Sequence, residues 1–301
     1  MLRSVGRPIC AAGALFWAAT LNAPAQYTYT TIDVPGSQST YACGISGSNI
    51  VGYYSENGTF QGFLYSGGSY TMLSVPGAAS TYAYGISGKN IVGYYLVGGI
   101  AHGVLYNGSE YITLSVPGAV ATGALGISGN DVVGWYWNGS INQGFLYDGS
   151  SYTTLNVPGT DNDTAEGISG NDVVGVYGDG SNYQGFLYDG NSYNTLSVPG
   201  AYSTEARDID ANNVVGFCNM GSEQGFLYNG SSYTTFSVAG AINTYAEGIS
   251  GNDIVGYSDF HSTSSPIIYT EGFLAIPVPE PSTFSLTFIG LIASLRRWTL
   301  H

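Results

Sequence analysis

Histidine and charged residues are scarce in this sequence. Charged side chains make up 9% of the 301 residues, and the body of the chain contains two histidines, His102 and His261. A zinc site needs about three convergent nitrogen or sulfur ligands, and a catalytic triad needs a histidine base. No serine lies in a nucleophile-elbow sequence. We therefore expect a protein without enzymatic activity.

Basic residues are fewer still, and most lie at the chain ends. Between residues 26 and 277 only Lys89 and Arg207 are basic, against nineteen of the 20 acidic residues, so this body has a formal charge of −17. Nucleic acids and anionic lipids need clustered Lys and Arg. We expect no nucleic-acid partner.

Cysteine occurs three times and long apolar runs are missing from the body. Cys10 lies near the N-terminus, and Cys43 and Cys218 lie in different repeats, which argues against an intramolecular bridge. Their redox state and role stay open.

The N-terminal segment, residues 1–25, has the features of a secretory signal peptide. Arg3 and Arg7 precede a mostly apolar stretch, and Ala23-Pro24-Ala25 gives a small-x-small cleavage pattern. The apolar stretch is too short for a typical bilayer span. We expect cleavage before Gln26 and export across the inner membrane.

The C-terminal segment, residues 277–301, combines a proline motif, a short apolar stretch and a basic end. The relevant residues are Val278, Pro279, Glu280, Pro281, Arg296 and Arg297. This order resembles the PEP-CTERM sorting signal of exported bacterial proteins. The resemblance implies a transient transmembrane helix as anchor, processing by an exosortase-type membrane protease, and release to the cell envelope or to a biofilm-like extracellular matrix. The apolar stretch is shorter than the roughly 20 residues of a typical span.

A unit of about 41 residues recurs six times in residues 26–276. Gly44-Ile45-Ser46-Gly47 returns at 85, 126, 167 and 248, and becomes Asp208-Ile209-Asp210-Ala211 in the fifth copy. Each copy divides into four short strand patterns, here called a to d, separated by turn sequences, and helical periodicity is missing. Four antiparallel strands in such a period are typical of one propeller blade.

The two ends of the repeat region complement each other. The body starts with a lone strand d, residues 27–34, and the last copy supplies strands a, b and c without d. The N-terminal strand can therefore complete the last blade and close the ring. The sequence predicts an all-β, six-bladed β-propeller, with a β-solenoid as the alternative.

The repeat unit is also similar to the extracellular HAF-type repeat of bacteria. The matching stretches are 143–147, Gln-Gly-Phe-Leu-Tyr, and 168–175, Ile-Ser-Gly-Asn-Asp-Val-Val-Gly. The His and Ala of that family's motif are replaced here. The resemblance implies an exported repeat protein and supplies no catalytic residue.

Comparison of the copies separates two faces of the predicted ring. The a–b and c–d turns barely change and form the constant face, whereas the b–c and d–a loops vary and form the variable face. Function usually lies on varied loops of a rigid scaffold. The second aromatic of each strand b lies next to this face, so the candidate glycan contacts are Tyr54, Tyr95, Tyr136 and Tyr177.

Acidic residues gather in the fourth copy. They are Asp161, Asp163, Glu166 and Asp179. Oxygen-rich clusters suit calcium, and paired carboxylates can cleave glycosides. We regard them as weak calcium candidates, since nineteen acids make chance clustering common, and we predict no other cofactor.

Together these features indicate an exported, non-enzymatic repeat protein of the bacterial envelope or extracellular polysaccharide matrix. Its expected role is structural or adhesive, with polysaccharide or other matrix proteins as partners. The alternatives are a lectin-like, glycan-binding propeller and, third, a polysaccharide-active glycosidase or lyase.

Overall fold

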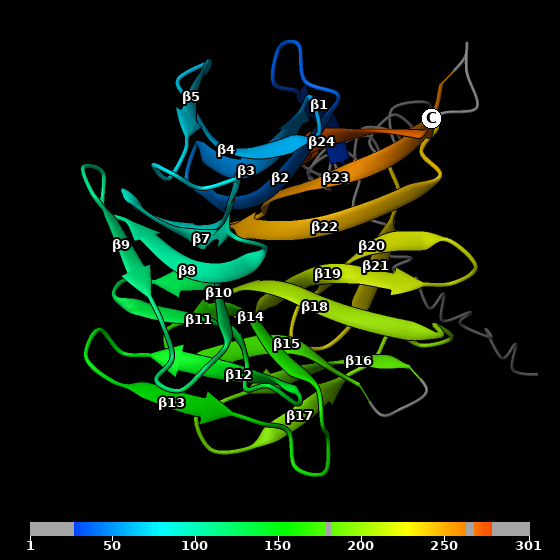
Figure 1. Cartoon of the computed structure of the whole chain (residues 1–301). Coiled ribbons are helices and arrows are strands. Elements are labelled where there is room, and N and C mark those ends of the chain that lie inside the picture. Colours follow the sequence, from blue (N-terminus) through cyan, green and yellow to red (C-terminus); the bar gives the residue numbers. More distant parts are fainter. Residues whose placement is uncertain (1–26, 179–181, 263–267, 279–301) are drawn as a thin grey trace, which may run out of the picture.

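The computed structural model describes residues 27–178, 182–262 and 268–278, and these residues form six four-stranded antiparallel sheets arranged as a ring (Figure 1). The β-propeller predicted from the sequence is confirmed, and every regular element of the described residues is a strand. No helix among them is long and apolar enough to cross a membrane.

Each blade places its strand a innermost and its strand d outermost. Blades 1 to 3 are β2 (Ser39–Ser46), β3 (Asn49–Glu56), β4 (Thr59–Ser66) and β5 (Ser69–Leu73); β6 (Ser80–Ser87), β7 (Asn90–Val97), β8 (Ile100–Tyr106) and β9 (Tyr111–Leu114); and β10 (Ala121–Ser128), β11 (Asp131–Trp137), β12 (Asn142–Tyr147) and β13 (Tyr152–Leu155).

Blades 4 and 5 repeat this order, and blade 6 differs in its last strand. The strands are β14 (Asp163–Ser169), β15 (Asp172–Gly178), β16 (Tyr183–Tyr188) and β17 (Tyr193–Leu196); β18 (Ser203–Asp210), β19 (Asn213–Asn219), β20 (Glu223–Tyr228) and β21 (Tyr233–Phe236); and β22 (Asn243–Ser250), β23 (Asp253–His261), β24 (Ile268–Pro277) and β1 (Tyr27–Ile32).

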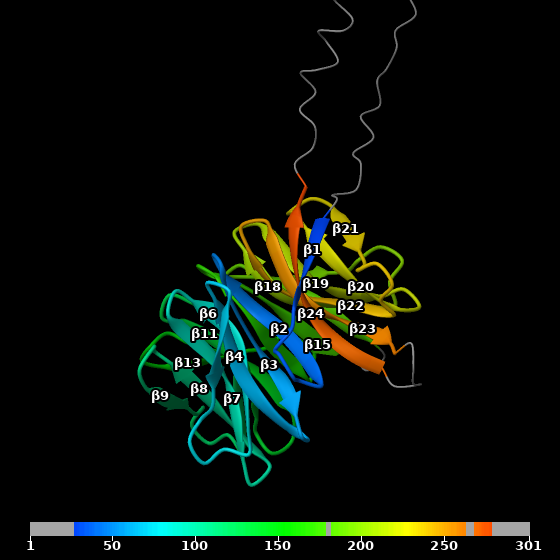
Figure 2. The ribbon, with the colours of Figure 1, turned by 90° about the horizontal axis from the view of Figure 1, so that it is seen from above.

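The N-terminal strand closes the ring, as the sequence predicts. β1 pairs antiparallel with β24 in a register that runs from Tyr27 opposite Pro277 to Ile32 opposite Gly272. The blue and orange strands lie side by side in both ribbon views (Figures 1 and 2). Because a paired strand offers its backbone groups to no other chain, β1 protects an edge that would otherwise be open.

The core lies between neighbouring blades and depends on a glycine in each strand b. Gly134 of β11 pairs with Phe145 of β12. The Phe145 ring is fully buried, and a Cβ on Gly134 would lie 2.9 Å from its Cε1 atom. Equivalent buried rings are Phe63, Phe186, Phe226 and Phe273. Burial of one such ring stabilises the fold by about 1.5–3 kcal/mol.

Hydrogen bonds between blades form a second closed circuit on the constant face. The first turn residue after each strand a donates its N–H to a side chain of the preceding blade, as Gly88 does to the Ser46 hydroxyl over 3.3 Å. The same contact recurs at Gly129, Gly170, Ala211, Gly251 and Gly47. The last of these joins blade 6 to blade 1, where Gly47 N donates to Ser250 Oγ over 3.1 Å.

We predict that blade 6 depends on β1. Deleting residues 27–32 leaves β24 as an unpaired edge, so the protein should aggregate or lose cooperative unfolding. Size-exclusion chromatography and urea unfolding measure both effects.

The double variant Thr28→Ser and Thr30→Ser is the matched control, because it alters two exposed side chains of β1 and keeps its backbone pairing. A deletion variant that stays monomeric and unfolds like the wild type would contradict closure by this strand.

Candidate functional site

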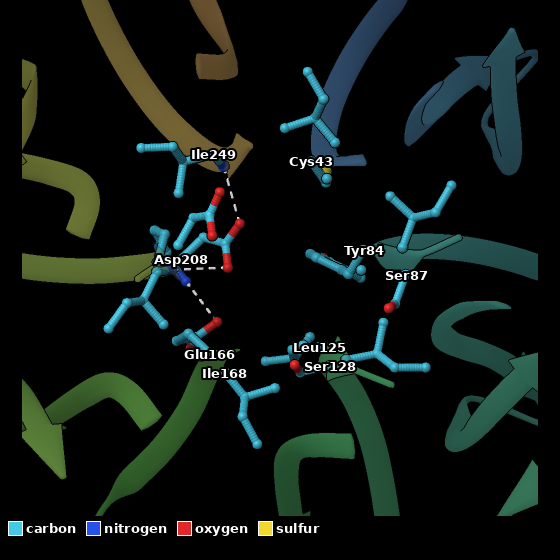
Figure 3. Close-up of a pocket in the computed structure, with 18 of the residues that line it drawn as sticks. Cys43, Tyr84, Ser87, Leu125, Ser128, Glu166, Ile168, Asp208 and Ile249 are labelled. Atoms are coloured by element: carbon cyan, nitrogen blue, oxygen red, sulfur yellow. Dashed lines mark hydrogen bonds and ion pairs between the residues drawn. The ribbon is translucent and has the colours of Figure 1, made fainter. Parts of the chain in front are cut away.

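A bulge in each innermost strand sends one side chain toward the axis of the ring. In β10, for example, the pairing with β11 shifts between Ala124 and Gly126, which leaves Leu125 without a partner in the register. The six residues at this position are Cys43, Tyr84, Leu125, Glu166, Arg207 and Glu247, and all of them line the central cavity (Figure 3). These six residues differ between copies, so they contribute much of the difference in chemistry around the axis.

Three of the six axial residues carry charge and lie on consecutive blades. The Arg207 guanidinium is 3.2 Å from a Glu166 carboxylate oxygen and 3.9 Å from one of Glu247, and it bonds Glu205 of its own strand over 2.8 Å. It also lies 4.9 Å from the centre of the Phe217 ring. The single positive charge of Arg207 thus forms ion pairs with three carboxylates, so the cluster has more acidic than basic groups.

Burial and charge excess shift the pKa values of these groups. Desolvation raises the pKa of Glu247 to about 7, with Arg207 opposing the shift, and it also raises the pKa of Glu205. Burial lowers the pKa of Arg207, but Glu166, Glu247 and Glu205 raise it by more, so the guanidinium stays protonated.

Asp208 adds a further buried carboxyl beside the axis. It replaces the glycine of the other copies and accepts hydrogen bonds from the N–H groups of Ile209 and Ile249 over 2.8 and 2.9 Å. Desolvation raises the pKa of Asp208 to about 7, although both N–H groups oppose the shift. The contact with Ile249 joins blades 5 and 6 (Figure 3).

Two hollows meet at the axial residues. The cavity toward the constant face has a volume of about 170 Å³. A second hollow of about 570 Å³ opens between blades 2 and 4 on the variable face. Tyr84, Leu125, Glu166 and Arg207 line both, so these four side chains form the partition between them.

The second hollow opens where a row of contacting aromatic rings ends. Ring contacts run from Tyr41 to Tyr53, Tyr82 and Tyr94 at centroid distances of 4.6, 5.0 and 4.7 Å, and end at Trp135, 6.1 Å from Tyr94. Tyr41 and Tyr82 of strand a are replaced by Gly123 and Thr164 in the next two copies.

These small residues make the space in which the Trp135 indole lies. A Cβ on Gly123 would be 2.5 Å from its Nε1 atom, so the indole packs directly over the glycine backbone. Trp137 also lines this hollow, and so do Asn142 and Thr164, which bring an amide and a hydroxyl group.

A third hollow continues the site across blades 3 to 5. Its volume is about 950 Å³, and it shares Asn142 and Thr164 with the second hollow. Tyr183 and Tyr202 line it and are 56% and 67% exposed. We call the two adjoining hollows the variable-face groove. It combines aromatic surfaces with amide and hydroxyl groups.

The four tyrosines predicted to contact glycan lie elsewhere. The hydroxyl of each contacts strand d of its own blade, at Met72, Thr113, Thr154 and Thr195 for Tyr54, Tyr95, Tyr136 and Tyr177 respectively. Tyr54 and Tyr136 are only 8% and 9% exposed, so these two rings are packed in the protein interior. Glycan contact by these tyrosines stays a prediction.

The acidic residues of the fourth copy have separate surroundings. In the other five copies a threonine hydroxyl accepts a hydrogen bond from a backbone N–H across the d–a loop. Asp163 takes the place of this threonine and accepts a hydrogen bond from Val157 N over 2.9 Å. Glu166 lies at the axis, Asp161 is exposed in the loop, and Asp179 is outside the described residues. Within residues 27–178, 182–262 and 268–278, no group of three or more His, Cys, Asp and Glu is arranged to hold a metal ion.

The remaining residues that the sequence analysis singled out are the two histidines and two cysteines of the body and the terminal motifs. His102 stacks on Tyr95 at 5.4 Å, and His261 ends β23. Cys43 and Cys218 are both buried free thiols. Val278 is exposed, whereas the signal peptide and the rest of the sorting motif lie outside the described residues.

The axial residues were not brought together by the sequence analysis, which named Glu166 only as a calcium candidate. Their signal is a varied position inside a partly repeated strand: the residue before Gly-Ile-Ser, or before Asp-Ile-Asp in the fifth copy, is Cys, Tyr, Leu, Glu, Arg or Glu. Such variation indicates a position that the repeated packing between blades does not constrain.

Comparison with known proteins adds structural likenesses at low identity. No protein-family model and no curated protein matches the chain. The β-propeller domain of the Trilobed protease from Pyrococcus furiosus is 8% identical, with a TM-score of 0.47, and the match covers 78% of this chain and 94% of that one.

Two further solved structures are similar at the same level. Virginiamycin B lyase from Staphylococcus aureus is 11% identical, with a TM-score of 0.46, over 85% of this chain and 90% of that one. Pyrococcus horikoshii acylaminoacyl peptidase is 11% identical, with a TM-score of 0.44, over 70% of this chain and 41% of that one.

The axial carboxyls predict a pH-dependent stability. A carboxyl whose pKa is raised on folding stabilises the fold fully below its unfolded pKa, and this contribution is lost as pH rises through the folded pKa. For Glu247 and Asp208 that window runs from about pH 4 to about pH 7. The melting temperature should therefore fall as pH rises across this window.

Glu247→Gln should reduce this slope, because it removes one of these two carboxyls. Asp253→Asn, at the half-buried first residue of β23 and outside the axial cavity, is the control and should keep the slope. Differential scanning calorimetry in buffers of equal ionic strength measures the melting temperature at each pH. A stability that rises from pH 5 to 7 would contradict the raised pKa values of Glu247 and Asp208.

Proposed function

We propose that this protein is an exported, non-enzymatic β-propeller that binds glycan chains of an extracellular polysaccharide matrix in its variable-face groove. The observation that carries the proposal is the composition of that groove. Trp135, Trp137, Tyr183 and Tyr202 supply ring surfaces, and Asn142 and Thr164 supply hydrogen-bonding groups. Sugar C–H faces stack on aromatic rings, and sugar hydroxyls need polar partners.

The length of the groove suits a polymer better than a small molecule. Its two hollows adjoin at Asn142 and Thr164 and extend from the axis to loops of blades 3, 4 and 5. A chain of several sugar units fills such an open path, whereas small ligands are usually enclosed.

The contacts of Glu166 favour a binding role over a glycosidase or lyase role. Its side chain is 10% exposed and already bonds Arg207 and the Thr164 hydroxyl, the latter over 2.7 Å. A general acid or base must reach the scissile bond with an available proton or lone pair. The Glu166 carboxylate is held in one orientation by both contacts, which suits a fixed polar contact with a bound ligand better than proton transfer.

The groove predicts which aromatic residues matter for retention. Trp137→Ala and Tyr202→Ala should each weaken binding to a polysaccharide by about ten-fold, because each removes one stacking surface. Both side chains are partly or largely exposed, so melting temperatures should change little. Pull-down on insoluble cellulose and chitin, followed by titration with soluble oligosaccharides, measures the effect.

Tyr269→Ala is the matched control, because Tyr269 is an exposed aromatic on blade 6 outside the groove. Unchanged retention by folded Trp137 and Tyr202 variants, or an equal loss in the Tyr269 variant, would reject the groove as the binding site.

The export part of the proposal is supported by the signal-peptide pattern and by the resemblance of residues 277–301 to a PEP-CTERM signal. Changing Pro279, Glu280 and Pro281 to Ala should leave an uncleaved protein in the inner membrane of a host that has an exosortase. Ser282→Ala with Thr283→Ala is the neighbouring control. Mass spectrometry of membrane and released fractions decides the point, and equal mass and location for wild type and motif variant would overturn it.

A further inference from the structure

The floor of the variable-face groove has more negative than positive charge. Arg207 and Glu166 both line the inner hollow, and Arg207 is shared with Glu205 and Glu247. With all four groups ionised the cluster carries an excess of two negative charges. Such an excess in a partly desolvated place is unfavourable, and it is offset either by protonation of a carboxyl, which the raised pKa of Glu247 favours, or by a bound cation.

No second cation supports Arg207 on this side of the molecule. Among the residues that the structure describes, Lys89 is the one other Lys or Arg, and it lies in the constant-face turn between β6 and β7. Its side chain lies near Gly108, in the β8–β9 turn of the same face. A sugar carboxylate or sulfate in the groove would therefore meet aromatic rings and carboxylates without a free positive partner.

The net charge of the body has the same negative sign as the floor of the groove. With nineteen acidic and two basic residues between 26 and 277, its field attracts polycations and repels polyanions at long range. The long-range field and the charge of the groove floor thus favour the same sign of ligand.

We propose that the groove selects glycans whose sugars carry free amino groups, with Glu166 as the residue that accepts the ligand ammonium. This inference rests on the glycan-binding function proposed above and specifies its ligand class. Aromatic stacking on Trp135 and Trp137 holds the sugar ring, and the carboxylate at the floor distinguishes an ammonium from an acetamide or a hydroxyl.

Glu166 is placed to act in this way. It lies at the partition, one of its carboxylate oxygens accepts from Thr164, and the other pairs with Arg207. A carboxylate offers about four lone-pair positions, so two donors leave room for a third. The fixed Arg207 and Thr164 contacts hold the carboxylate in one orientation for the incoming ammonium.

Three oligosaccharides of equal length test the proposal on the wild-type protein by isothermal titration: a glucosamine hexamer, its fully N-acetylated form and a galacturonate hexamer. The glucosamine hexamer should bind about ten-fold tighter than the acetylated form at low salt, and added salt should reduce the difference. The galacturonate hexamer should bind weakest.

Two isosteric variants separate the local carboxylate from the overall field. Glu166→Gln should bring the ratio of the affinities for the amine and acetylated hexamers down to about one. Glu110→Gln removes the same charge from an exposed constant-face turn and should keep the preference. Circular dichroism confirms that each variant is folded, and the wild-type comparison stands without either variant.

The outcomes distinguish this inference from the function on which it rests. Equal affinity for the amine and acetylated hexamers overturns the amine selectivity and leaves glycan binding intact. Preference for galacturonate, or an equal loss in both variants, also overturns it. Failure of every oligosaccharide and of insoluble polysaccharide to bind overturns both proposals.

Discussion

Close backbone contact at the axis is the constraint on which the rest of the ring depends. Five of the six innermost strands pass so near the next that a side chain at the contact has no room; a Cβ on Gly126, for example, would lie 2.7 Å from the Glu166 carbonyl oxygen. The glycine permits this approach, and the bulge beside it turns the preceding side chain toward the axis. Blade packing and axial chemistry therefore come from two adjacent residues of the same strand.

This coupling explains why six near-identical repeats enclose an asymmetric centre. Packing fixes the isoleucine that follows the bulge, and the glycine before it in five of the six copies, whereas the bulged residue makes different contacts in different copies. Blades 4 to 6 place Glu166, Arg207 and Glu247 there, and blades 1 to 3 place Cys43, Tyr84 and Leu125. The charged half and the uncharged half share one scaffold, and Asp208 adds a carboxyl where the other copies have glycine.

Most of the fold could be predicted from the sequence because repetition and phase are properties of the chain itself. The lone strand at Tyr27 and the missing strand d of the last copy predict the pairing with β24 without knowledge of any contact. The groove could not be predicted in the same way. A bulge shifts the alternation of faces, so the direction of Glu166 is not evident from its spacing.

The aromatic residues illustrate the same limit. Tyr136 and Trp135 are adjacent in the sequence and equally near the variable loop, yet one ring bonds Thr154 of its own blade and the other lines the groove. The indole of Trp135 lies over Gly123, where a side chain would leave it no room, and that glycine is on a different strand.

The pairing of β1 with β24 also sets the order in which the molecule can be assembled. The strands that meet in blade 6 are the first and the last of the body, so β1 has no partner until residues 268–277 have been synthesised. Closure then joins segments separated by nearly the whole domain, which makes it a slow, high-contact-order step. Blades 1 to 5, each built from consecutive strands, can form locally before it, and the chain stays an open arc until its final strand arrives.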